Sequence, residues 1–143
     1  MASCATYDDV NLVLRLYDLR REDRMREARR WFVRDCKVKT LAEQQKLCPP
    51  GSDESDYFRM VVTYWDMAAS FVAQGVLHPD IFFESNREML LVWVRISPFI
   101  AEYRESVGDP EAWGNLEKVA DPFRKWLEAR GPKTYESFLA RVG

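Results

Sequence analysis

The sequence predicts an all-α protein: a single-domain bundle of five or six main helices over residues 1–143, around a central buried helix at about 55–75. Three observations favour this class. Apolar residues recur at steps of three and four along most of the chain, as on one face of an α-helix. The alternation that is typical of strands nowhere reaches a useful length. A chain of 143 residues also suits one domain with its own hydrophobic core.

Two helices are expected at the start of the chain, at about 7–20 and 22–36, either as separate elements or as one continuous rod. Thr6 followed by Asp9 resembles a capping box, which marks a helix start. Apolar residues then recur at helical spacing in two phases. The first phase comprises Val10, Val13, Leu14 and Tyr17, and the second Met25, Ala28, Phe32 and Cys36.

A short helix and a loop are predicted before the centre of the chain. Thr40 precedes an apolar-polar run with Glu43 three residues later, which indicates a capped helix at about 40–47. The segment at 48–56, CPPGSDESD, contains two prolines, a glycine and small polar residues and is therefore expected to be a loop.

The central helix is predicted from the segment at 57–75, YFRMVVTYWDMAASFVAQG. Two apolar rows cover most of its surface, and its polar residues form one narrow stripe. A helix that is apolar nearly all round is buried, and Gly75 is a natural C-terminal stop. The rows comprise Phe58, Val61, Val62, Trp65, Ala68, Ala69 and Val72, and Tyr57, Met60, Tyr64, Met67 and Phe71.

Proline positions predict the later elements. Proline is favoured at the first position of a helix, so helices are expected to start near 79, 110 and 122. Pro98 instead lies within an apolar run, where a kink or break is expected. A short tail helix is expected near Tyr135.

Composition and charge exclude several classes of function. The 21 Lys and Arg residues nearly balance the 23 Asp and Glu residues, so no global field favours nucleic acid or an anionic membrane. With three cysteines, one histidine and no CxxC motif, neither a metal site nor a cofactor is expected. We expect no signal peptide, no transmembrane segment and a reducing, cytoplasmic setting. Cys36 is predicted in the core, Cys4 and Cys48 as exposed thiols, and His78 as a cap.

The segment at 20–30 holds six arginines and three acids. Phosphate or nucleic-acid contact is one interpretation. A solvated helix face with internal ion pairs is favoured instead, because the acids are interleaved with the arginines. Arg24 and Arg29, with Trp31 and Trp126 beside arginine-rich segments, form a candidate surface for a protein partner.

Asp66 is the most informative single residue, because it lies in the middle of a helix that should be buried. A buried carboxylate is costly unless it finds a partner. A structural ion pair or a hydrogen bond between helices is one interpretation, with Arg87, Arg95 and Arg104 as candidate partners. The other is a polar pocket in which Asp66 faces Arg95 or Arg104.

Three segments together resemble an uncharacterised family of small bacterial helical proteins, classed as a domain of unknown function. They are LYDLRREDRMREARRWFV at 16–33, YWDMAASFVAQGVL at 64–77 and VWVRISPFIAEYR at 92–104. The resemblance would cover about 12–127. It implies a helical bundle, with Asp66, Trp93 and Arg104 at matching positions, and it implies no activity.

Two classes of function follow. The leading hypothesis is a non-enzymatic helical module that binds a protein partner, including a second copy of itself as a homodimer. The alternative is a small-molecule-binding protein or an unrecognised enzyme with a polar pocket near Asp66. Binding of an anionic surface through 20–30 is a third hypothesis.

Overall fold

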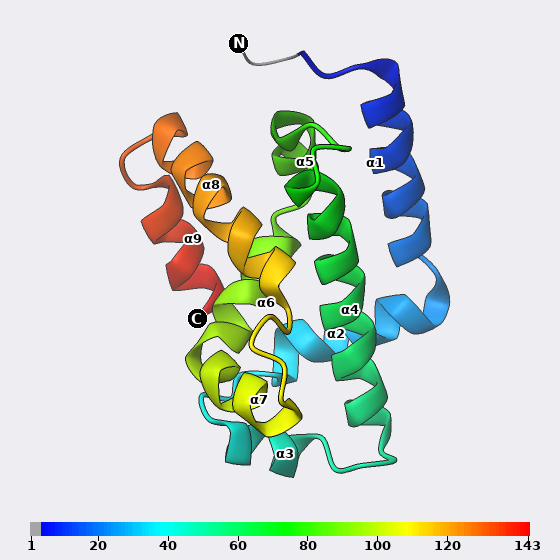
Figure 1. Ribbon diagram of the computed structural model, residues 1–143, viewed down its shortest axis with the longest axis vertical. Coiled ribbons are helices and arrows are strands. Elements are labelled where there is room, and N and C mark those ends of the chain that lie inside the picture. Colours follow the sequence, from blue (N-terminus) through cyan, green and yellow to red (C-terminus); the bar gives the residue numbers. More distant parts are fainter. Residues whose placement is uncertain (1–3) are drawn as a thin grey trace.

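The computed structural model describes residues 4–143, whose regular secondary structure is all helical, with no strand among them (Figure 1). The elements are α1 (Tyr7–Arg20), α2 (Asp23–Asp35), α3 (Leu41–Leu47), α4 (Asp53–Ala73), α5 (Pro79–Ser85), α6 (Glu88–Ile96), the 3₁₀ turn η1 (Ser97–Phe99), α7 (Ile100–Val107), α8 (Gly114–Arg130) and α9 (Thr134–Val142). The predicted fold class is confirmed.

The helix α4 is the centre of the bundle, with α2, α6 and α8 packed around it. Its buried residues are Phe58, Val61, Val62, Tyr64, Trp65, Ala68 and Ala69. The first predicted apolar row is therefore buried except for Val72, whereas only Tyr64 of the second row is buried and Met67 is 38% exposed. The expected central buried helix is confirmed along the first row, and the second row is only partly covered.

The helices α1 and α2 are separate elements, and α2 runs across the direction of α1 (Figure 1). The break has a local cause in Glu22. Its carboxylate accepts hydrogen bonds of 3.0 Å from the backbone N–H groups of Arg24 and Met25, which lack partners at a helix start. The alternative of one continuous rod is thereby corrected.

The four prolines used for the predictions occupy different places relative to the helices. Pro79 begins α5, and η1 interrupts the helix at Pro98, as predicted. The helix α8 begins at Gly114 rather than near 110, and Pro122 lies inside it. Pro122 is exposed, so water can satisfy the carbonyl that loses its backbone donor there. The predicted starts near 110 and 122 are therefore wrong.

The three cysteines differ in their exposure to solvent. Cys4 is exposed and Cys36 is buried, as expected, but Cys48 is also buried, contrary to the prediction. Burial raises the pKa of Cys36 to about 12 and that of Cys48 to about 11. Both thiols are therefore packing groups and not ready nucleophiles.

None of the helices in the described part of the chain is long and apolar enough to cross a membrane.

Candidate functional site

Asp66, on α4, lies beside the first turn of α8 and accepts two hydrogen bonds from it. The backbone N–H of Leu116 donates to Oδ1 over 3.2 Å, and the Asn115 side chain donates to Oδ2 over 3.2 Å. The residue before α8, Trp113, has a left-handed conformation with φ of 56° and makes no side-chain cap. Asp66 thus provides, from another helix, the acceptor and the negative charge that a helix start favours.

Arg95 is not a partner of Asp66. It is 4% exposed and donates to four backbone carbonyls instead. Three of these belong to Phe32, Val33 and Cys36 at the end of α2, at 3.0, 3.0 and 2.8 Å, and the fourth belongs to Val142 at the end of α9, at 2.6 Å. Carbonyls at helix C-termini carry partial negative charge, and most lack a backbone donor; the Phe32 carbonyl also accepts from the backbone N–H of Cys36 over 3.1 Å. Arg95 therefore ties two helix ends together, and burial lowers its pKa.

Arg104 and Arg87 do not bond to Asp66 either. Arg104 holds the loop before α8, donating from Nε to the Ala112 carbonyl and from Nη2 to Glu117, each over 2.9 Å. Arg87 is half-buried at the residue before α6. The arginine partners expected for Asp66 are therefore wrong, whereas the other expected alternative, a hydrogen bond between helices, is present: neutral donors at a helix start satisfy the carboxylate.

A shallow groove of about 480 Å³ lies beside Asp66. Its walls include the nearly parallel rings of Tyr103 and Trp113, whose centroids are 6.0 Å apart. The groove also contains Asp109 and Glu111 and none of the three arginines. A polar pocket near Asp66 is therefore present in outline, but with acidic and aromatic walls.

The four residues of the expected partner surface do not form one surface. Trp31 is buried and packs against Tyr57, and Trp126 is half-buried on α8, against Phe83 of α5. Arg29 is drawn into an ion pair within the bundle. Only Arg24 is well exposed, with 47% of its side chain accessible. Its guanidinium lies 3.7 Å from Asp53 and 3.9 Å from Asp56. The expected surface is thus corrected, because packing covers both tryptophans.

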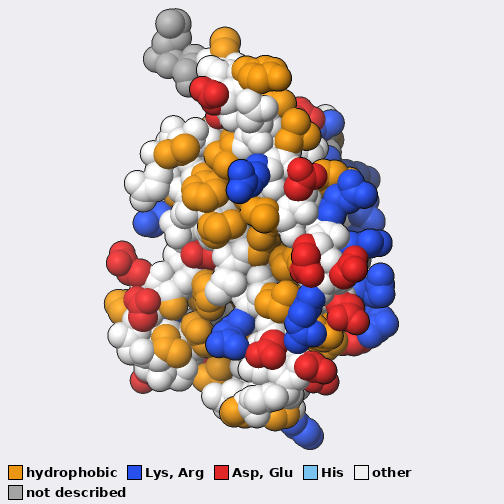
Figure 2. Space-filling view, turned by 90° about the vertical axis from the view of Figure 1, so that its right-hand side faces the viewer, with side chains coloured by type: hydrophobic (Ala, Val, Ile, Leu, Met, Phe, Trp, Pro, Cys, Tyr) orange, Lys and Arg blue, Asp and Glu red, His pale blue; other side chains and the backbone are white. Residues whose placement is uncertain are grey.

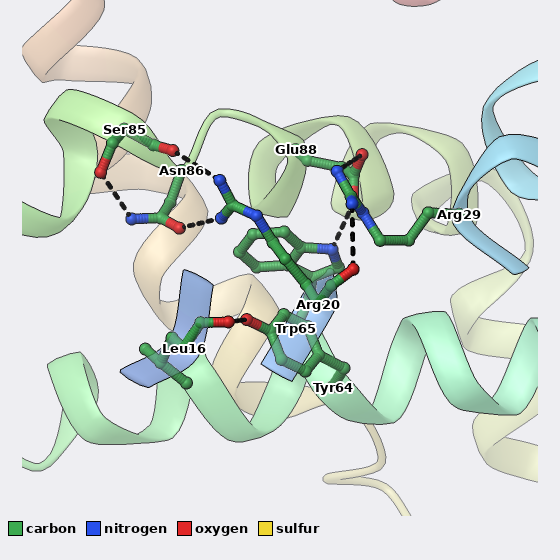
Figure 3. Close-up of polar contacts among 8 residues, drawn as sticks. All are labelled: Leu16, Arg20, Arg29, Tyr64, Trp65, Ser85, Asn86 and Glu88. Carbon is green, nitrogen blue, oxygen red and sulfur yellow. Dashed lines mark hydrogen bonds and ion pairs between the residues drawn. The ribbon is translucent and has the colours of Figure 1, made fainter. Parts of the chain in front are cut away.

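A polar network that the sequence analysis missed joins α1, α2, α4 and α6 (Figure 3). The Glu88 carboxylate accepts from Trp65 Nε1 over 2.8 Å and from two nitrogens of Arg29 over 2.7 and 3.2 Å. Arg29 also donates to the Arg20 carbonyl over 3.2 Å. Only 19% of the surface of the Glu88 side chain is exposed to solvent. The charge of Glu88 is therefore balanced by a partner from another helix, a pairing that spacing along the chain does not reveal.

The same network continues to the end of α1. Arg20 donates to Asn86 Oδ1 over 2.6 Å, and its guanidinium lies over the Trp65 ring at 5.4 Å from the centroid. The Tyr64 hydroxyl donates to the Leu16 carbonyl. Burial raises the pKa of Tyr64 to about 12, so it remains a neutral donor. These contacts fix the inner side of α1 onto the bundle.

The opposite side of α1 carries four exposed large side chains, which we call the outer face of α1. They are Tyr7, Val10, Leu14 and Tyr17, with 78%, 37%, 54% and 42% of their surfaces exposed. The guanidinium groups of Arg20 and Arg21 lie 5.0 and 5.2 Å from the centre of the Tyr17 ring. Figure 2 views the molecule from this side and shows hydrophobic side chains along it. Three of the four belong to the row of Val10, Val13, Leu14 and Tyr17 whose helical spacing predicted this helix.

The inward row of α1 is a different one. Leu16 is buried, and Leu12 and Val13 are packed against the core. The helix thus has two apolar rows, and periodicity alone does not say which one meets the bundle. The existence of a second row, Leu12 with Leu16, was the signal available in the sequence.

The start of α1 is joined to the start of α5 by Asp9. Its carboxylate accepts from the backbone N–H of Thr6 over 2.7 Å and from that of His78 over 2.8 Å. These bonds lower the pKa of Asp9. His78 in turn caps α5, since its Nδ1 accepts from the backbone N–H of Asp80 over 3.1 Å, as expected for a cap.

Residues 5–126 match the family model described as a domain of unknown function, DUF4760. The chain belongs to this family. The DUF4760 region contains α1 through most of α8, and so includes the outer face of α1, the Glu88 network and Asp66. No curated protein and no solved structure matches the chain. Within the described residues of this DUF4760 protein, no group of His, Cys, Asp and Glu side chains is placed to hold a metal ion.

Proposed function

We propose that this DUF4760 protein is a helical interaction module that binds a protein partner through the outer face of α1. The observation that carries the proposal is the exposure of four large apolar side chains at steps of three, four and three residues along one helix. This is the spacing of the a and d positions by which two helices pack together. The partner chemistry that fits is therefore an amphipathic helix.

The outer face is not needed to hold α1 in place, because the other side of the helix does so. Leu16 is 1% exposed, and Arg20 is bonded to Asn86 across the bundle. An exposed apolar row of this kind is a feature that marks interaction surfaces. Covering a side chain such as Leu14 would contribute up to about 1.5–3 kcal/mol, so a helix laid on this face would gain stability.

The edge of the outer face adds a condition on the partner. Asn11 and Asp18 are exposed along one edge of it, and Asp18 gives this edge a negative charge. A partner helix with a positive charge beside its apolar row would meet a complementary group at Asp18, whereas an acidic partner would meet repulsion there.

The test is photo-crosslinking in the producing cells, with p-benzoylphenylalanine at Leu14 and, as the matched control, at the exposed Gln45 of α3. We expect a defined adduct from position 14 only, and its loss when Tyr17→Glu is added in the folded protein. An adduct that ignores Tyr17→Glu, or no adduct beyond that of position 45, would overturn the proposal.

A second candidate function, binding of a small organic cation, is favoured by the groove beside Asp66. Its acidic groups lie next to the paired rings of Tyr103 and Trp113, and carboxylates with aromatic faces attract such cations. The test is a thermal shift with tetramethylammonium or spermidine against sodium chloride of equal ionic strength. A shift abolished by Glu111→Gln would support this candidate, and equal melting temperatures would remove it.

A further inference from the structure

We infer that α1 is a docked arm, which opens from the bundle as one unit at a hinge formed by Arg21 and Glu22 while the other helices stay folded. Figure 1 shows α1 at the edge of the molecule, joined to α2 by this turn. Proteins open locally in contiguous units, and the units with the fewest buried apolar contacts open most easily. The opening itself does not depend on the proposed function, whereas its consequence for the outer face of α1 rests on it.

The apolar contacts that hold α1 are few for a helix of its length. Leu16 is its one buried apolar side chain, and Leu12 and Val13 are half-buried. The helix α2 is of similar length and buries Met25, Ala28, Trp31 and Phe32. Burial of apolar surface is the main favourable contribution to folding. The docking of α1 therefore depends on its polar contacts more than the docking of α2 does.

These polar contacts lie at both ends of α1. At the start, Asp9 accepts from the backbone N–H of His78 over 2.8 Å. In the second half, the Leu16 carbonyl accepts from the Tyr64 hydroxyl, and Arg20 donates to the Asn86 side chain (Figure 3). Each such bond adds little net stability, because water replaces it when the helix is released. Since the contacts span the helix, α1 is released only when they break together.

The opening of α1 leaves the start of α2 intact. Glu22 caps α2 by accepting from two backbone N–H groups of its own helix, so α1 supplies no cap. Arg29 loses its bond to the Arg20 carbonyl but keeps both bonds to Glu88. The turn at 21–22 can therefore act as a hinge without disturbing the helix that follows it.

Opening also removes the outer face. The helix α1 has 14 residues, and isolated helices shorter than about 12–15 residues are marginal in water. The released arm therefore loses most of its helix, and its four large apolar side chains no longer lie on one side. A partner helix that binds the outer face binds only the docked form and so stabilises it. The docking of α1 thus regulates the proposed partner binding.

Native-state hydrogen exchange of the full chain, with no partner present, tests the opening. We expect the backbone amides at 11–20 to exchange through one common opening, about tenfold or more faster than the slowest amides of α4. Tyr64→Phe removes one anchor and should speed exchange at 11–13 as much as at 17–20, by about three- to tenfold. Tyr57→Phe is the matched control, since its hydroxyl bonds to Glu27 of α2, and it should leave these amides unchanged.

Two results of this experiment would overturn the inference. One is exchange of the α1 amides at the rate of the slowest amides of α4, because α1 would then open only with the whole fold. The other is an effect of Tyr64→Phe that is confined to the amides next to Leu16, because the helix would then not move as a unit.

Trypsin provides a second measurement on the wild-type chain. Arg15 on α1 and Arg26 on α2 are both exposed and both lie within a helix. Cleavage inside a helix follows the population of its opened form when opening and closing are fast. We expect cleavage after Arg15 to be about tenfold or more faster than cleavage after Arg26, and equal rates would contradict a separate arm.

Leu16→Asp tests the consequence for the outer face, because it places a charge at the one buried apolar contact of α1. We expect rapid cleavage after Arg15, unchanged protection at Arg26, and loss of the crosslinked adduct from position 14. An adduct that persists although Arg15 is cleaved rapidly would overturn the regulation. In the wild type, an adduct together with slow exchange of α1 means that the arm fails and the interaction module stands. Fast exchange with no adduct means the reverse.

Discussion

Glu88 accepts the indole N–H of Trp65 over 2.8 Å, at a point where the central helix meets the start of α6. The indole belongs to a side chain that is 0% exposed, and the carboxylate is also held by Arg29. One acidic group thus satisfies a buried donor and a half-buried cation from two other helices. A carboxylate held in this way favours one arrangement of α2, α4 and α6.

Removing this carboxylate should therefore cost more than a surface substitution. We expect Glu88→Ala to lower the free energy of unfolding by about 1–3 kcal/mol, because it leaves the Trp65 N–H and the Arg29 guanidinium unpaired. Glu88→Gln keeps one acceptor oxygen and should lose less. Urea unfolding followed by tryptophan fluorescence measures both, and the indole N–H resonance of Trp65 should move in each. Losses below about 0.5 kcal/mol for both variants would show that the network adds nothing.

Arg95 should be among the least replaceable side chains. Arg95→Met retains the apolar stem but removes every donor to the carbonyls that end α2 and α9, so we expect a loss of about 3 kcal/mol or more. Arg95→Lys keeps the charge and has too few directed donors for all four acceptors. We expect it to lie between wild type and Arg95→Met in chemical denaturation. Arg141→Lys, on an exposed residue of α9, is the control and should be neutral.

Asp66 should stabilise the start of α8 without an arginine. Asp66→Ala removes the acceptor for the Leu116 N–H, and a lost helix cap costs about 0.5–2 kcal/mol. Asp66→Asn keeps an acceptor oxygen and should cost less. Hydrogen exchange of the first-turn amides of α8 reports the effect at the site. Protection of Leu116 unchanged in Asp66→Ala would rule out the cap.

The stability of the fold should fall in acid partly through Asp9. Its pKa is lowered by the backbone N–H groups of Thr6 and His78. A depressed pKa means that the stabilisation is fully present above the pKa of the unfolded chain and is lost as the pH falls through the folded pKa. We expect Asp9→Asn to be less stable than wild type near neutral pH and to lose less stability in acid. Parallel pH dependences of the two unfolding free energies would contradict this role.

The three thiols should react at very different rates. Cys4 is exposed, whereas burial raises the pKa of Cys36 to about 12 and that of Cys48 to about 11. The thiolate is the reactive form, so the native protein at neutral pH should show one fast-reacting group with Ellman's reagent. Cys4→Ser should abolish this fast phase, and all three thiols of the wild type should react in denaturant. A second fast thiol in the native protein would show that the core opens at α2 or α3.

Much of the fold could be read from local signals. The helix start at Pro79, the break at Pro98 and the cap at Thr40 depend on neighbouring residues, and each lies where it was predicted. The helix α4 was predictable because its apolar residues surround it nearly completely, so burial does not depend on which neighbour covers which side. The start of α8 was not, because it follows a turn in which Trp113, not a proline, takes the final position.

The sequence by itself determined that this protein is a helical bundle with a buried central helix, since helical periodicity and capping act within a few residues. Only the tertiary structure decided which row of α1 meets the bundle, and that Asp66 serves α8, 49 residues away, while Arg95 serves the ends of α2 and α9. The reason is physical. A buried charge needs a partner of suitable geometry, but any helix end or opposite charge can provide one, and the packing of distant segments selects it.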